Sequence, residues 1–394
     1  MHGKVVVASA GALLALALVT AGCGGDGGGS SQPFASAATT AGAHSGSATP
    51  TSTASSSGTT TSPTTAASPS PATSPAPAGP RYVVSGWLPA WARTHGDAMI
   101  DANTGIALDE VNLFGWGLKP DGTLIRATGM DDPARVALVR SRGGEVIPTI
   151  YDVNDANALE AVLASASARA QGIRSMLNLL DQGGYDGIDL DFEHAKASNR
   201  DAFSAWVAEL GREVKARGKV FSVTIPGKRA DLPSWAGYDY AALGAAADRI
   251  KIMTYGYSGT WTNYPGGPVA PTDWIEKVLD YAVTVIPPGK IQVGIPFYGY
   301  DWADDGSTAR SVTYLRSQTL LTQTGAVVSY QPTRGEAKFT YTSGGVNHTV
   351  WFSEERSIAA KAALVKRYGL LGLSVWALGY GDPPVWDAIR QTLK

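Results

Sequence analysis

The segment 186–193 alternates acidic and apolar residues and could carry acid–base chemistry. It reads Asp-Gly-Ile-Asp-Leu-Asp-Phe-Glu. Side chains alternate between the two faces of a strand, so Asp189, Asp191 and Glu193 share one face with Gly187, and the apolar side chains share the other. Buried like charges oppose ionisation and raise the pKa of at least one carboxyl group. A carboxyl that keeps its proton near neutral pH can protonate the leaving oxygen of a glycoside.

Two other interpretations remain open for this segment. It could be a merely solvated acidic strand, or a site for Mg²⁺ or Ca²⁺, which favour carboxylate ligands. A solvated strand does not explain the apolar residues opposite the acids, so catalysis without a metal or cofactor is the preferred hypothesis. Asp186 has the opposite parity, and together with Gly187 it is interpreted as structural support.

The elements that must position these acids alternate along the chain after residue 80. Short apolar runs are separated by helical patterns, for example the apolar face repeated through residues 203–214. This alternation predicts an α/β fold, a (β/α)8 TIM barrel, with a doubly wound sheet as the alternative. The eight predicted strands cover residues 82–87, 108–114, 145–150, 187–192, 220–225, 250–255, 291–297 and 371–376.

The oversized gap between the seventh and eighth predicted strands contains further strand-like pieces. It predicts a small α+β insertion at about residues 303–350 within a catalytic domain at 81–394. Glu193 falls at the C-terminal end of the fourth strand, and barrel active sites open at that end of the strands.

The N-terminal 80 residues have a different character. Residues 1–23 resemble a bacterial lipoprotein signal that ends in a lipobox, which predicts export and lipid attachment at Cys23, the only cysteine. Thr20 departs from the usual aliphatic residue there, so ordinary secretion is the alternative. Residues 24–80 are rich in Ser, Thr, Pro, Ala and Gly and are expected to form a disordered tether. The predicted location is the outer face of the cell membrane.

Charge and motif content narrow the remaining function classes. The chain has 32 Lys and Arg against 34 Asp and Glu, and without a basic stripe we expect no nucleic-acid partner. The five histidines form no zinc-binding pattern, and no nucleophile elbow or phosphate-binding loop is present. A monomer that contacts the membrane only through its lipid is expected.

The motif Asp186-x-x-Asp189-x-Asp191-x-Glu193 resembles the D-x-x-D-x-D-x-E signature of glycoside hydrolase family 18, which includes chitinases and endo-N-acetylglucosaminidases. The resemblance extends over most of the chain after Pro80. Residues 252–255 (Ile-Met-Thr-Tyr) and 294–299 (Gly-Ile-Pro-Phe-Tyr-Gly) are similar to the sixth and seventh strands of the family. The insertion also has a family counterpart.

The resemblance implies a retaining mechanism without a protein nucleophile. Glu193 would protonate the glycosidic oxygen, while the substrate's 2-acetamido carbonyl attacks the anomeric carbon. Asp191 would orient the acetamido group and share a proton with Asp189, and Tyr255 would donate a hydrogen bond to the acetamido oxygen. The expected substrates are N-acetylglucosamine polymers, either chitin or peptidoglycan.

Aromatic residues near strand ends could stack on sugar rings, although for each of them core packing is the alternative. Gly256 and Tyr300 replace Asp and Arg residues common in the family, and the run 298–302 (Tyr-Gly-Tyr-Asp-Trp) is similar to the spore-cortex and cell-wall branch. A non-catalytic lectin on the same fold is the rival hypothesis. The predicted substrate-binding residues are Trp87, Trp116, Met253, Tyr257, Tyr298, Trp302 and Trp376.

Overall fold

The structure is a computed structural model that describes residues 81–101 and 108–394. The predicted signal, Cys23 and the tether at 24–80 lie outside the described residues. Within the described ranges, no helix combines the length and the apolar character needed to cross a membrane.

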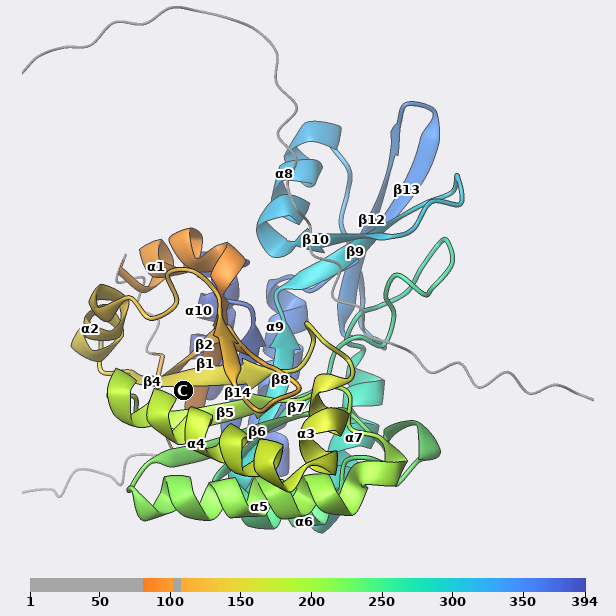
Figure 1. The fold of residues 1–394 in the computed structure, drawn as a ribbon. Coiled ribbons are helices and arrows are strands. Elements are labelled where there is room, and N and C mark those ends of the chain that lie inside the picture. The colour runs from red at the N-terminus through yellow and green to blue at the C-terminus, as the bar shows by residue number, and fades with distance from the viewer. Residues whose placement is uncertain (1–80, 102–107) are drawn as a thin grey trace, which may run out of the picture. The chain divides into compact units, whose positions relative to one another are not determined.

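Eight parallel strands close into a barrel, which confirms the predicted fold (Figure 1). They follow one another around the barrel in sequence order, and β1 pairs with both β2 and β14 to close it. A short strand, β3 (Leu124–Arg126), extends β2 as an antiparallel hairpin. The barrel strands are β1 (Val83–Pro89), β2 (Glu110–Leu118), β4 (Glu145–Tyr151), β5 (Gly187–Asp191), β6 (Val220–Pro226), β7 (Arg249–Met253), β8 (Ile291–Pro296) and β14 (Gly372–Trp376).

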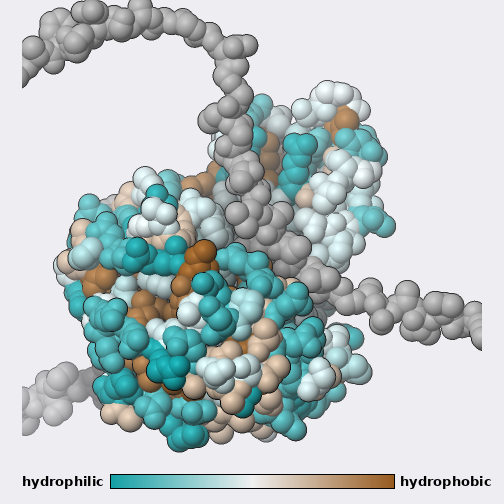
Figure 2. Space-filling view, viewed as in Figure 1, coloured by the Kyte–Doolittle hydropathy of each residue, from teal (hydrophilic) through white to brown (hydrophobic). Residues whose placement is uncertain are grey.

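Amphipathic helices cover the outside of the barrel. The apolar face predicted within residues 203–214 is buried in α5, and Phe192 after β5 stacks on Trp206 with ring centroids 5.8 Å apart. Gly369, at φ 61°, ends α9 in the left-handed conformation typical of a helix C-terminus. The side that carries α4 and α5 presents mostly hydrophilic residues to solvent (Figure 2). The helices are α1 (Arg93–Asp101), α2 (Pro133–Ser141), α3 (Ala158–Ala164), α4 (Ala166–Gly183), α5 (Arg200–Ala216), α6 (Tyr240–Ala246), α7 (Thr272–Val285), α9 (Glu355–Tyr368) and α10 (Pro383–Leu393).

The insertion is a five-stranded antiparallel sheet with one helix, in the order β10-β9-β13-β12-β11. It begins at Tyr298 and ends at Phe352, so it is wider than the 303–350 expected from the sequence, because β9 starts almost directly after β8. Its elements are β9 (Tyr298–Ala303), β10 (Arg310–Thr313), α8 (Tyr314–Thr324), β11 (Ser329–Gln331), β12 (Glu336–Ser343) and β13 (Val346–Phe352).

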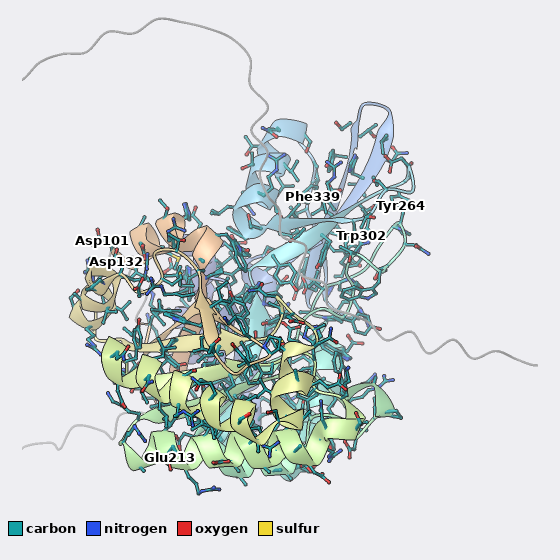
Figure 3. The ribbon with its side chains drawn as sticks, in the orientation of Figure 1. Asp101, Asp132, Glu213, Tyr264, Trp302 and Phe339 are labelled. Atoms are coloured by element: carbon teal, nitrogen blue, oxygen red, sulfur yellow. The ribbon has the colours of Figure 1, made fainter. Side chains whose placement is uncertain are left out.

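Buried polar contacts attach the insertion to the barrel. Glu336 of β12 lies 3.1 Å from Lys361 of α9, and both side chains are fully buried. The same carboxylate accepts a hydrogen bond from the Ala270 backbone N–H at 3.1 Å. Trp302 of β9 donates its indole N–H to the Thr262 carbonyl at 2.8 Å (Figure 3). These contacts hold the insertion beside the loop that follows β7.

Candidate active site

The predicted acidic face forms on β5 and just beyond it. Asp189 and Asp191 are buried inside the barrel, whereas Glu193 lies two residues past the strand end and is partly exposed. Gly187, at the start of the strand, has no room for a side chain: a Cβ there would lie 2.3 Å from the Val220 carbonyl oxygen of β6. The narrow contact between β5 and β6 therefore requires glycine at this position.

Asp186 lies at the opposite end of β5 from Glu193. One of its carboxylate oxygens accepts a hydrogen bond from the Val146 backbone N–H at 2.9 Å and lies 3.1 Å from the guanidinium of Arg140. The side chain thus connects the beginnings of β4 and β5, as its structural interpretation requires.

The buried carboxylate of Asp189 is surrounded by donors from four other barrel strands, β1, β4, β6 and β7. The proton that Asp189 was expected to share with Asp191 stays a prediction. Lys251 also contacts the buried Glu110, so one lysine serves two carboxylates. The donors to Asp189 are Trp87 Nε1 at 3.1 Å, Thr149 Oγ1 at 2.9 Å, Ser222 Oγ, Thr224 Oγ1 at 3.3 Å and Lys251 Nζ at 3.3 Å.

Asp191 lies between Asp189 and Glu193 along the chain and is buried. Burial raises its pKa well above the ordinary value, and the charges of Glu193 and Asp189 raise it further. Its Oδ1 atom is buried and has no hydrogen-bond partner among the described residues. This unpartnered oxygen leaves Asp191 able to accept a hydrogen bond from the N–H group of a bound molecule.

Glu193 has the properties of a general acid. Burial raises its pKa to about 8, and the neighbouring Asp152 carboxylate contributes in the same direction. The side chain therefore keeps its proton at neutral pH.

Asp152, which follows β4, is a functional residue that the sequence analysis missed. Its carboxylate is fully buried and accepts hydrogen bonds from the backbone N–H groups of Glu193 at 2.8 Å and His194 at 3.2 Å. It also lies 3.1 Å from the His194 ring and raises the pKa of that imidazole. Asp152 therefore fixes the backbone that carries the acid. An Asp two residues beyond the end of a predicted strand was the only available signal.

Asp152→Asn should weaken this backbone anchor and remove a charge that raises the pKa of Glu193. We expect kcat to fall about tenfold, the cost of a slightly misplaced acid. Because a raised pKa keeps the acid protonated up to about pH 8, its alkaline limb in a kcat/KM profile should move to lower pH in the variant. Asp201→Asn, at an exposed position on α5, is the matched control. An unchanged limb in Asp152→Asn would contradict this role.

Tyr255 and Met253 reach the site from the end of β7. Burial raises the pKa of Tyr255 well above its ordinary value, so its hydroxyl remains a donor. Its ring packs edge-on against Tyr298, with centroids 6.1 Å apart. Gly256 follows with φ 76°, a conformation that costs a side-chain-bearing residue energy. This backbone gives a local reason for glycine where the family commonly has Asp.

Trp376 ends β14 within a group of aromatic rings. Its ring lies edge-on to Phe114, with centroids 5.0 Å apart, and 6.3 Å from Trp91, which is 52% exposed. Trp91 was not predicted, yet its exposed ring is better placed for stacking than several tryptophans that were.

Three predicted sugar-binding tryptophans are buried and offer no free ring face. Trp87 is 1% exposed and is used to hold Asp189. Trp116 is 3% exposed and packs edge-on against Tyr185. Trp302 is 1% exposed and fixes the insertion. The structure supports core packing for all three, because sequence position at a strand end does not determine which way a ring points.

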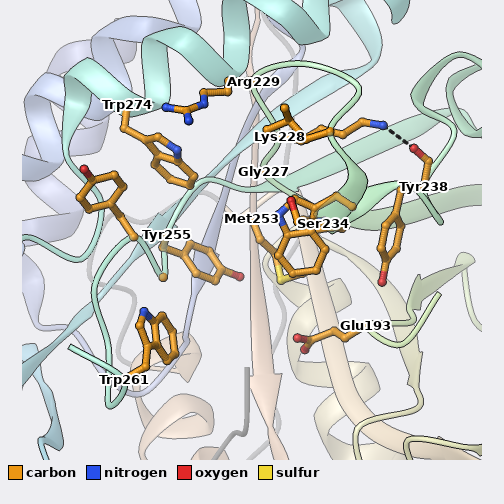
Figure 4. Close-up of a pocket in the computed structure, with 15 residues that line it drawn as sticks. Glu193, Gly227, Lys228, Arg229, Ser234, Tyr238, Met253, Tyr255, Trp261 and Trp274 are labelled. Carbon is orange, nitrogen blue, oxygen red and sulfur yellow. Dashed lines mark hydrogen bonds between the residues drawn. The ribbon is translucent and has the colours of Figure 1, made fainter. Parts of the chain in front are cut away.

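A pocket of about 290 Å³ opens beside Glu193 (Figure 4). Met253 and Tyr257, predicted to bind substrate, and Tyr255, predicted to be catalytic, contribute to its wall, and these roles stay predictions. The sequence analysis missed most of the remaining wall, which comes from loops after β6 and β7 and from α7. Its further aromatic members are Trp235, Tyr238, Trp261 and Trp274. Across residues 81–101 and 108–394, no cluster of three or more His, Cys, Asp or Glu side chains is arranged to hold a metal ion.

Comparison with known proteins assigns this geometry to a family. The sequence profile described as glycosyl hydrolases family 18 matches residues 138–381, more than half of the chain. The chain belongs to glycoside hydrolase family 18. The matched residues include the whole of β5, Glu193 and Tyr255, together with Trp376 of β14.

Individual proteins are similar to this chain over most of the described part. The "Uncharacterized glycosylase YvbX" of Bacillus subtilis (strain 168) is 33% identical over 251 residues, which cover 62% of this chain and 72% of that protein. The "Cortical fragment-lytic enzyme" of Bacillus anthracis is 29% identical over 294 residues, covering 71% and 66%. The crystal structure of a chitinase from Chromobacterium violaceum ATCC 12472 has a TM-score of 0.73 at 30% identity, covering 79% and 99%. The chain is therefore a glycoside hydrolase.

Proposed function

We propose that this hydrolase cuts β-1,4 bonds in polymers that contain N-acetylglucosamine, either chitin and its oligosaccharides or peptidoglycan, with retention of anomeric configuration. The observation that carries the proposal is the position of Glu193, a carboxyl with a pKa of about 8 at the edge of an aromatic pocket. Similarity to proteins named as chitinases and cortex-lytic enzymes supports this substrate class. The lectin hypothesis gains no support from these relatives.

The proposed mechanism uses one protein acid. Glu193 donates its proton to the glycosidic oxygen as the bond to the anomeric carbon breaks, and the acetamido oxygen of the same sugar forms a bond to that carbon. Asp191 accepts a hydrogen bond from the acetamido N–H, and Tyr255 donates one to the acetamido oxygen. The bond from the acetamido oxygen to the anomeric carbon closes an oxazolinium ring. Glu193, now ionised, then takes a proton from the water that attacks the anomeric carbon and opens this ring.

Secretion and lipid attachment at Cys23 are part of the proposal as well. A protein anchored outside the membrane by a long tether would have the cell wall within its reach. Mass spectrometry of the N-terminal peptide, released from membranes of cells that express the full chain, tests this part: an unmodified Cys23 thiol on the mature protein contradicts it.

An acetamido group that acts as the nucleophile makes the N-acetyl group a requirement. We expect the full chain to cleave N-acetylglucosamine hexamers or purified peptidoglycan, and to cleave fully de-N-acetylated versions at least about 10³-fold more slowly, the loss of an intramolecular reactant. Proton NMR during early turnover should show the β-anomer as the first product. An α-anomer as first product, or equal rates on de-N-acetylated substrate, would overturn substrate assistance.

A further inference from the structure

The pocket beside Glu193 extends from Tyr255, the proposed partner of the reacting acetamido group, past Glu193 to the loop after β6. In the proposed mechanism, the sugar whose acetamido group reacts lies against Asp191 and Trp376. Neither of these residues lines the pocket, whereas Glu193, Met253 and Tyr255 do. Since Glu193 protonates the oxygen between the two sugars, the sugar beyond it enters this pocket.

The lining of the pocket carries more basic side chains than ionised acidic ones. Glu193 is the only carboxyl among the described residues that line it, and its pKa of about 8 keeps it neutral at pH 7. Two cations, Lys228 and Arg229, belong to the same wall. The glycine at position 256 adds no negative charge to this wall. A neutral oligosaccharide gives no reason for this imbalance.

The two cations differ in how much of their charge is already used. Lys228 is buried, and its ammonium group lies 2.8 Å from Asp231 and donates to the Tyr238 carbonyl at 2.6 Å. Arg229 is exposed, and it forms no ion pair or side-chain hydrogen bond with any residue that the structure describes. In Figure 4, Arg229 and Trp274 lie across the pocket from Glu193.

The backbone under Arg229 is held in place. The Tyr240 hydroxyl accepts a hydrogen bond from the Lys228 backbone N–H at 3.1 Å, and Gly227 packs so closely that a Cβ there would lie 3.0 Å from the Met253 carbonyl oxygen. A fixed backbone that presents an unpaired guanidinium suits planar, two-point recognition of a carboxylate.

We propose that Arg229 binds a carboxylate carried by the leaving-group sugar, as found on N-acetylmuramic acid through its lactyl ether or through an attached stem peptide. This inference rests on the proposed function and deepens it, because it selects peptidoglycan glycan over chitin. The aromatic side chains Trp261 and Trp274 supply apolar surface for the ring of that sugar, and Arg229 reads its acidic substituent.

The test compares Arg229→Met with the wild-type full chain on three substrates: N-acetylglucosamine hexamer, glycan strands stripped of peptide with free lactyl carboxylates, and peptide-bearing glycan. We expect kcat/KM on the carboxylate-bearing glycans to fall about tenfold, the size of one charge-assisted hydrogen bond, and to stay unchanged on the hexamer. Arg229→Lys should restore part of the loss. Arg212→Met, exposed on α5, is the matched control.

The outcomes distinguish the lactyl carboxylate from a stem-peptide carboxylate. They also distinguish failure of the role of Arg229 from failure of the proposed function. A loss on stripped glycan assigns the lactyl group, and a loss only on peptide-bearing glycan assigns the stem peptide. Equal losses on the hexamer and on both glycans, or no loss on any of them, overturn the role of Arg229. If the wild-type chain cleaves none of the three substrates, the proposed function itself fails.

Discussion

Glu193→Gln should lower kcat by about 10³- to 10⁴-fold, the upper part of the range for loss of a general acid. Glutamine has nearly the same shape but no proton of suitable pKa to donate, so the glycosidic oxygen must leave as an alkoxide. Binding of intact oligosaccharide should persist, because the aromatic pocket and Trp376 are unchanged. Turnover is measured from the product formed at fixed reaction times, and affinity is measured separately by isothermal titration calorimetry.

The matched control for this variant is Glu209→Gln, an exposed glutamate on α5, which should retain full turnover. If the wild-type protein and Glu193→Gln bind oligosaccharide equally and neither cuts it, the catalytic assignment is wrong. If Glu193→Gln keeps more than about a tenth of the wild-type kcat, another group supplies the proton.

Lys251→Met should be the most destabilising substitution among the residues near the site. Lys251 is fully buried and contacts both Glu110 and Asp189. Burial acts to raise the pKa of Glu110, yet the charges of Lys251 and Arg249 outweigh it and hold that pKa below its ordinary value. Removing one partner of such a buried pair costs about 3–5 kcal/mol. Calorimetry should show a Tm lower by roughly 6–12 °C.

The destabilisation should depend on pH. Without Lys251, burial should raise the folded-state pKa of Glu110 above its value in the unfolded chain, so that this carboxyl favours folding only where it stays protonated. The Tm difference from wild type should therefore shrink as pH falls towards about 4, the ordinary range for carboxyl groups. Lys277→Met, exposed on α7, should change Tm by less than about 1 °C. If the Tm difference between Lys251→Met and the wild-type protein is the same at pH 5 and pH 8, a carboxylate left without its cation is not the cause of the destabilisation.

The sequence predicted the parts of this protein that follow from short-range periodicity. The eight barrel strands were predicted from short apolar runs, and the shared face of Asp189, Asp191 and Glu193 needs only the alternation of a strand. The apolar surface of α5 needs only the repeat of a helix. Because these patterns are local, a reader of the sequence can extract them without knowing what packs against them.

The contributions that were missed or misassigned depend on neighbours far along the chain. Asp152 matters because β4 lies beside β5, which brings its carboxylate to the Glu193 backbone across 41 residues. Trp87 was expected to face sugar but donates to Asp189, 102 residues away. The proposed role of Arg229 in binding a carboxylate depends on the absence of an ionised acid among the described residues that line the pocket. Such features are set by the tertiary fold.

The two connections of the insertion lie side by side. β9, which follows β8, pairs with β13, which leads into α9, and Gly299 is the partner of Phe352 in that ladder. A segment whose ends meet in this way closes its own loop, so residues can be added or removed beyond the paired strands at small entropic cost to the barrel. The part of the insertion beyond these paired strands can therefore diverge in evolution independently of the acids on β5.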